Sequence, residues 1–287
     1  KCTAVCPVGV EGDKMRIAQR SIRKYNLAPS YANIDENLLI ERCNKFASAS
    51  NKNVSSGNNQ KVIYFAGCMT ALTPSIHKAM TGILEKAGTD YTFMDRDGGI
   101  CCGRPMMMAG RIDQAKEMVA KNTEIIKASG ADILLLSCPI CYKIFKEEYQ
   151  LEGIEIIHHT EYIDRLINEG RLEVSSDDSR YVYHDPCELG RGCGVYDEPR
   201  RVISHTGHLV EAAKHGKESV CCGGSLGSIS LSFEKRRYLT ESALRNLTAD
   251  NPDKIITACP LCKTTFARYS ERKVYDIAEL VESKIIN

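Results

Sequence analysis

The sequence predicts an α/β protein made of two pseudo-symmetric cysteine-rich modules, and a repeated cysteine pattern is the main reason. Each set holds a single cysteine, an adjacent pair followed by glycine, and a C-P-x-C motif. The first set is Cys68, Cys101, Cys102, Cys138 and Cys141, and the second is Cys187, Cys221, Cys222, Cys259 and Cys262. The three parts repeat after 119, 120 and 121 residues, so the sets stay in register along the chain.

Short β-rich runs lead into the single cysteine and into the C-P-x-C motif of each half, at residues 61–66, 132–136, 180–183 and 254–257. Helical periodicity follows each cysteine pair, and each half closes with a further strand and an amphipathic helix. Strands that alternate with helices indicate a small parallel sheet flanked by helices in each module. We therefore expect a first module at 61–171 and a second at 180–287, joined by a polar linker near 173–179.

Composition and charge narrow the function classes. The net charge of +1 gives no electrostatic reason to expect nucleic acid, and no apolar run approaches the length of a membrane span. Contact with a membrane would have to come through a partner subunit. With 14 cysteines in 287 residues, the chain is too long and too rich in core residues for a secreted disulfide scaffold. A cytoplasmic, reducing compartment with metal-bound thiolates fits better.

The strand order explains how ten distant cysteines could form two metal sites. Ligands of a parallel sheet collect beyond the carboxyl ends of its strands, and each cysteine locus is expected after a strand. Glycine after each adjacent pair (Gly103 and Gly223) permits a turn that directs both sulfurs inward. Structural zinc is the competing interpretation, but zinc takes four ligands and each set offers five thiols. Soft thiolates in this number favour an iron–sulfur cluster.

The string C-x32-CCG-x34-C-P-x-C, repeated with x33 and x35, resembles the cysteine-rich CCG domain family, over residues 61–287. This family includes the catalytic subunit of heterodisulfide reductase and the iron–sulfur subunits of glycolate and glycerol-3-phosphate dehydrogenases. The strings at 184–187 (HDPC) and 196–200 (YDEPR) are similar to family strings as well. The resemblance implies one noncubane [4Fe-4S] cluster on each cysteine set, with all ten cysteines as ligands.

The beginning of the chain, residues 1–60, is expected to be a helical remnant of a ferredoxin-like domain. Residues 1–7 (KCTAVCP) resemble the end of a ferredoxin signature whose first two cysteines are absent. Cys2 and Cys6 are therefore candidate cluster-binding residues that cannot complete a site alone. We expect the chain to be part of a longer polypeptide whose preceding portion carries cubane [4Fe-4S] clusters.

Several other residues allow two interpretations each. His184 is a candidate proton donor or a hydrogen-bond partner of the cluster. Cys43 and Cys193 are extra thiols for which burial is the simpler interpretation. Lys143 and Lys263 could hold an anionic substrate, although solvated surface charge is the safer interpretation.

The resemblance implies an oxidoreductase of heterodisulfide-reductase type, in which paired clusters reduce a disulfide or a similar two-electron acceptor in a cleft between the modules. The alternative is an electron-transfer subunit between a flavin dehydrogenase and a quinone or other carrier. Either function needs other redox subunits, containing flavin or ferredoxin-type clusters, and a small-molecule disulfide or an electron carrier.

Overall fold

The computed structural model describes residues 10–23, 60–69, 73–96, 100–224, 228 and 231–286. Ahead of the first module it describes the helix α2 (Gly12–Arg23). Cys2, Cys6 and Cys43 lie outside the described residues, so the predicted ferredoxin-type remnant stays a prediction.

The first module is a parallel four-stranded sheet in the order β2-β1-β3-β4. Its strands are β1 (Val62–Phe65), β2 (Tyr91–Phe93), β3 (Ile133–Leu136) and β4 (Glu155–His158). Its helices are α4 (Pro74–Lys86), α5 (Arg104–Met108), α6 (Ile112–Ala128), α7 (Pro139–Glu148) and α8 (His159–Asn168). All four residues of both β1 and β3 are buried, as expected for central strands covered on two faces.

The second module repeats this topology with the order β6-β5-β7-β8, again all parallel. Its strands are β5 (Arg180–His184), β6 (His208–Val210), β7 (Lys254–Thr257) and β8 (Lys273–Asp276). The α-helices are α9 (Gly190–Cys193), α10 (Asp197–Ser204), α11 (Phe233–Thr248), α12 (Pro260–Ala267) and α13 (Ile277–Glu282), and a 3-10 turn, η3, spans Gly216–Glu218. The predicted pair of pseudo-symmetric α/β modules is therefore confirmed.

A strand is expected before each cysteine pair, but sequence periodicity does not locate the edge strands β2 and β6. Each has three residues, and their side chains are half-buried or exposed, so neither forms an apolar run. These strands are recognisable only through their pairing with the buried strands β1 and β5.

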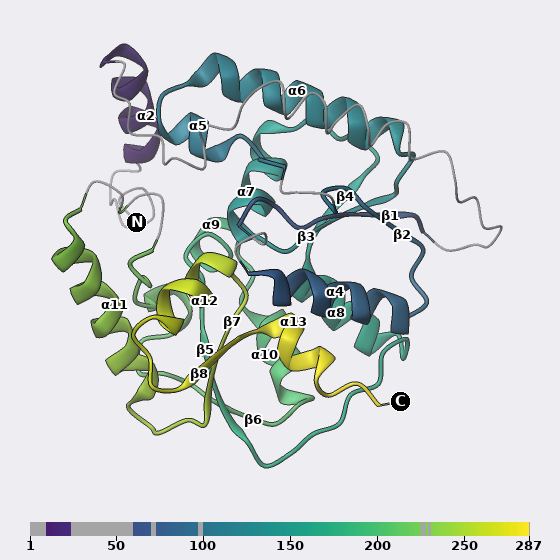
Figure 1. The fold of residues 1–287 in the computed structure, drawn as a ribbon, viewed down its shortest axis with the longest axis vertical. Coiled ribbons are helices and arrows are strands. Elements are labelled where there is room, and N and C mark those ends of the chain that lie inside the picture. Colours follow the sequence, from purple (N-terminus) through teal and green to yellow (C-terminus); the bar gives the residue numbers. More distant parts are fainter. Residues whose placement is uncertain are drawn as a thin grey trace.

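The two modules join through equivalent helices that exchange partners. Helix α4 lies against α13, and the equivalent helix α10 lies against α8, as a pseudo-two-fold axis requires. Figure 1 shows the first sheet above the second, with α4, α8, α10 and α13 between them and α6 on the outer side. The buried core of the first sheet continues without a break into side chains of β5, α10 and α13.

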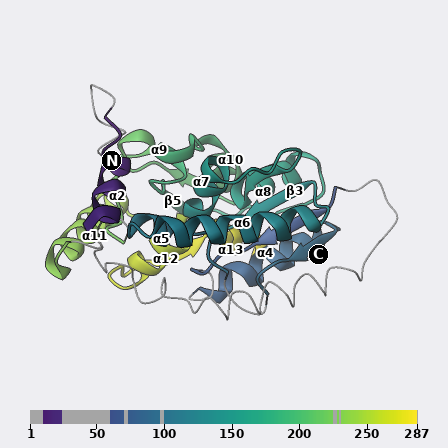
Figure 2. The same ribbon diagram turned by 90° about the horizontal axis from the view of Figure 1, so that it is seen from above.

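The linker between the modules is held against the end of the chain. Val174 forms an antiparallel bridge with Ile285, and Ser175 N–H donates to Lys284 C=O at 2.8 Å. Figure 2 shows α2 and α11 on the side of the molecule away from the C-terminus. Among the described helices, none combines the length and apolar character that crossing a membrane would need.

Candidate metal centre

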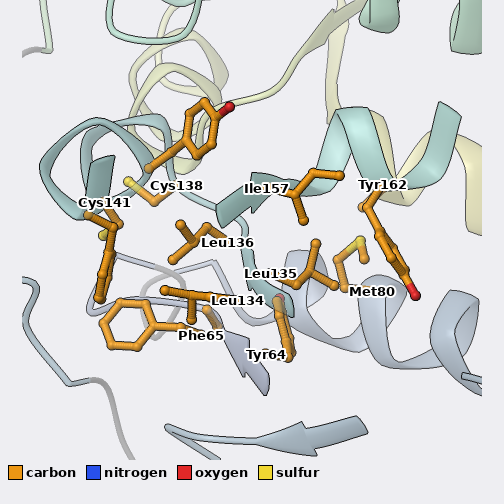
Figure 3. Close-up of a cluster of buried hydrophobic side chains, with 14 of the residues drawn as sticks. Tyr64, Phe65, Met80, Leu134, Leu135, Leu136, Cys138, Cys141, Ile157 and Tyr162 are labelled. Atoms are coloured by element: carbon orange, nitrogen blue, oxygen red, sulfur yellow. The ribbon is translucent and has the colours of Figure 1, made fainter. Parts of the chain in front are cut away.

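The first cysteine set converges at the carboxyl ends of the central strands. Cys68 follows β1, and Cys138 and Cys141 follow β3, where Figure 3 shows them beside Leu136 and Phe65. The strand ahead of the adjacent pair, β2, ends at Phe93, well before Cys101, so the pair does not directly follow a strand as expected. In spite of this, the four cysteines after Cys68 are all buried, and Cys68 is half-buried.

Hydrogen-bonding contacts link the five sulfurs of the first set into one continuous chain. They run from Cys68 to Cys101, from Cys101 to Cys102, from Cys102 to Cys141 and from Cys141 to Cys138. Each link joins one thiol directly to the next, so the chain offers soft donors to a metal.

The second set forms the same chain in the same order. Contacts run from Cys187 to Cys221, from Cys221 to Cys222, from Cys222 to Cys262 and from Cys262 to Cys259. Cys262 Sγ donates to Cys222 Sγ at 3.3 Å, well beyond a disulfide bond length, and all ten cysteines are free thiols. The cysteines that correspond in the sequence repeat therefore make the same contacts in the two modules.

Each chain of thiols favours at least one thiolate. Hydrogen bonds from Cys101 and Cys141 lower the pKa of Cys102 to about 6. In the second set, hydrogen bonds from Cys187 and Cys222 lower the pKa of Cys221. The donating thiols shift the other way, and the hydrogen bond to Cys101 raises the pKa of Cys68. Because metals bind the thiolate, the lowered pKa values of Cys102 and Cys221 favour metal binding in each set.

A glycine after each adjacent pair makes the turn that packs the sulfurs together. Gly103 and Gly223 have φ of 88° and 83°, in the left-handed region that favours glycine. A methyl group on Gly223 would also lie 2.8 Å from the backbone oxygen of Arg236 in α11. The backbone N–H of Gly103 donates to Cys101 Sγ at 3.4 Å, so the turn itself stabilises charge on sulfur.

The C-P-x-C motifs begin helices. Cys138 and Cys259 are the N-cap residues of α7 and α12, and Pro139 and Pro260 occupy the first helical positions. One turn of helix brings the two cysteines of each motif to the same centre.

A buried carboxylate orders the loop before the first cysteine in each module. Asp95 accepts hydrogen bonds from the backbone N–H groups of Ala66 and Gly67, at 2.8 and 2.7 Å, and burial raises the pKa of Asp95 to about 7. In the second module Asp185, inside the loop itself, accepts from Gly216 N–H at 2.7 Å. Sequence reasoning missed Asp95 because nothing in its neighbourhood marks it as a loop anchor.

The two short strings that resembled family motifs meet in the structure. Arg200 donates to both carboxylate oxygens of Asp185, at 2.8 and 3.0 Å, and to both of Glu211, at 2.6 and 3.1 Å. The arginine of the 196–200 string thus holds the aspartate of the 184–187 string, and with it the loop that carries Cys187.

Each cysteine site borders the opposite module. Lys263, next to Cys262, donates to Ser75 at the start of α4 at 2.8 Å. On the other side, Lys143 of α7 lies 3.7 Å from Glu188, the residue after Cys187. The start of α4 therefore contacts the C-P-x-C helix α12 of the second module, and the residue after Cys187 contacts the C-P-x-C helix α7 of the first, so residues next to both cysteine sets lie at the junction.

The two lysines proposed as substrate-binding cations are already paired. Lys263 Nζ lies 2.6 Å from Glu279 Oε1 with both side chains largely buried, and Lys143 also lies 3.7 Å from Glu147. These carboxylates offset part of the attraction that either lysine would have for an anion, so anion binding here stays a prediction. With 19% and 14% of their side chains exposed, Lys143 and Lys263 are not the freely solvated charges of the safer interpretation.

The structure also places His184, Cys193 and the pair His158 and His159. His184 ends β5, and one of its ring nitrogens lies within 4.8 Å of Cys222 Sγ and Cys262 Sγ. Cys193 packs against the core at the end of α9, and burial raises the pKa of Cys193 to about 12. Burial is thus the better interpretation of Cys193. His158 and His159, to which sequence reasoning assigned no role, are fully buried at the junction.

The CCG cysteine-rich domain model matches residues 62–146 and 181–267, so the chain belongs to this family and carries two copies of the domain. A subunit of the dihydromethanophenazine:CoB–CoM heterodisulfide reductase of Methanosarcina acetivorans is 32% identical, over 73% of this chain and 54% of its own. An EtfAB:quinone oxidoreductase of Syntrophomonas wolfei is 29% identical, over 78% of this chain and 34% of its own length. A subunit of the fumarate reductase (CoM/CoB) of Methanothermobacter marburgensis is 27% identical, over 98% of this chain and 59% of its own length. The chain thus spans 34–59% of the length of these relatives.

Proposed function

We propose that this chain is an iron–sulfur redox subunit whose two cysteine sets each hold one noncubane [4Fe-4S] cluster. The donor set supports iron–sulfur chemistry, because each site brings five thiols into contact. Tetrahedral zinc would use only four of them. Relatives that are named as subunits of redox enzymes support the same conclusion.

The reaction that we propose is two-electron reduction of a disulfide or a comparable acceptor. One observation supports it: residues next to both cysteine sets, Lys263 and Glu188 in the second module and Lys143 in the first, contact the opposite module. A disulfide needs two electrons, whereas one iron–sulfur cluster usually supplies one, so two clusters near a single acceptor meet the requirement. The protein itself contributes the ligands, the hydrogen bonds to sulfur and the separation of the two sites.

An electron relay to a quinone or another carrier is the alternative, and one relative named as a quinone oxidoreductase favours it. In that case no bond of a substrate would break at the junction, and one cluster could suffice. Under either function, the electrons would come from a partner subunit that contains flavin or ferredoxin-type clusters.

The first test is metal analysis of anaerobically purified protein. We expect iron and acid-labile sulfide for two four-iron clusters, with EPR signals that change on reduction. Zinc without acid-labile sulfide, in a colourless protein, would refute the iron–sulfur proposal.

The second test separates reduction from relay. The dithionite-reduced protein should be oxidised by an added small-molecule disulfide, and a Cys259→Ala variant should lose most of this rate. Cys259 belongs to the second set alone, so the first cluster remains available as a relay. Equal rates in the variant and the unmodified protein would refute the paired-cluster reaction and leave the relay.

A further inference from the structure

The two modules differ at one position beside the sulfurs. Phe65 is the last residue of β1, and His184 is the last residue of the equivalent strand β5. Each lies three residues before the first cysteine of its set, and each is buried, with 0% and 2% of its surface exposed. The repeat thus replaces a phenylalanine by a histidine at a buried site.

Both rings occupy the same kind of slot. Phe65 packs edge-on against Phe145, with ring centroids 5.1 Å apart and an interplanar angle of 73°. His184 packs edge-on against Phe266, the residue equivalent to Phe145, at 4.7 Å and 87°. The histidine ring therefore takes the orientation of the phenylalanine ring, and the difference between the two sites is chemical.

That difference lies close to the cluster ligands. In the first module a methyl group on Gly67 would lie 3.1 Å from Cys141 Sγ and 3.5 Å from Phe65 Cε1, so Phe65 presents ring carbon near the sulfurs. In the second module a ring nitrogen of His184 and the sulfurs of Cys222 and Cys262 all lie within 4.8 Å of one another.

We propose that His184 donates a ring N–H to the sulfur ligands of the second cluster and thereby raises its reduction potential above the value that phenylalanine would give. This inference rests on the proposed function, because it needs a cluster on the second cysteine set. An electron added to a cluster places part of its charge on the sulfurs, and an N–H donor stabilises that charge. Neutral imidazole carries one N–H, so the effect needs no protonation of the ring.

The test measures the midpoint potential of each cluster by EPR during titration with dithionite. A Cys101→Ser background isolates the second cluster, and a Cys222→Ser background isolates the first. We expect His184→Phe to lower the potential of the second cluster, and His184→Gln, which keeps an N–H donor, to restore part of the loss. The reciprocal variant Phe65→His should raise the potential of the first cluster, and it remains informative if His184→Phe does not load iron.

An unchanged potential in His184→Phe, with iron and sulfide retained, would overturn the inference while leaving the iron–sulfur function intact. So would a first cluster whose potential does not rise in Phe65→His. By contrast, failure of the proposed function would show as unchanged iron content in the Cys222→Ser protein.

Discussion

His159 Nε2 lies 3.0 Å from Asp276 Oδ1 across the junction of the modules, and both side chains have 0% exposure. Asp276 is also the N-cap of α13 and accepts from Ala278 N–H at 3.0 Å. Within the described residues, His159 Nδ1 and Asp276 Oδ2 have no hydrogen-bond partner. This pair is a buried polar contact between β8 of the second module and α8 of the first.

Breaking the pair should destabilise the protein strongly. His159→Leu removes the imidazole and leaves Asp276 buried beside an apolar group, which should cost about 3 kcal/mol in the free energy of unfolding. Denaturant unfolding followed by circular dichroism measures the loss. The double variant His159→Leu/Asp276→Asn keeps the cap without a carboxylate, so it should recover part of the stability. If it is no more stable than His159→Leu, an unpaired buried carboxylate is not the cause.

Two equivalent tyrosines should respond differently to loss of their hydroxyl groups. Tyr64 Oη lies 2.8 Å from Ser137 Oγ, whereas the repeat places Ala258 where Ser137 stands, and Tyr183 Oη has no partner among the described residues. Tyr64→Phe should cost about 1 kcal/mol, and Tyr183→Phe should be neutral or stabilising. Equal losses in the free energy of unfolding of Tyr64→Phe and Tyr183→Phe would contradict this explanation.

The cysteine sets should lose iron independently. Cys101→Ser and Cys222→Ser should each remove the iron and sulfide of one cluster, about half of the total, because each thiol belongs to a different chain of sulfurs. Cys193→Ser is the matched control, since half-buried Cys193 packs against the core and belongs to neither chain of sulfurs, so the iron content should stay unchanged. Full iron content in either of the first two variants would show that the ligand assignment is wrong.

Acid sensitivity should depend on His158. Burial holds the pKa of His158 well below its usual value of 6.5. Below pH 6.5 the histidine therefore binds a proton in the unfolded chain but stays neutral in the folded chain. Stability from this residue is complete above pH 6.5 and is lost as the pH falls below it, by about 1.4 kcal/mol per pH unit. His158→Asn keeps an N-cap acceptor without a titrating ring. As the pH falls from 6.5 to 5, the free energy of unfolding of the variant, measured in denaturant, should rise relative to that of the unmodified protein. A difference in free energy between the two proteins that stays constant across this range would rule the mechanism out.

The sequence by itself determined the repeat, the strand that leads into each single cysteine and C-P-x-C motif, and the helix that starts at Pro139 or Pro260. These features follow from local periodicity and backbone preference, which act over a few residues. Convergence of the cysteines followed too, because parallel strands bring their carboxyl ends to one edge of the sheet.

Only the tertiary structure decided how deeply and against what each residue packs. His159 became a junction residue because α8 lies against α10 and α13 of the other module, and no spacing along the chain encodes that contact. Lys263 became a paired cation because Glu279 of α13 lies within 2.6 Å. Burial and pairing depend on surfaces that meet only after both modules have folded, so a residue's chemistry at the junction is decided by its partners in space.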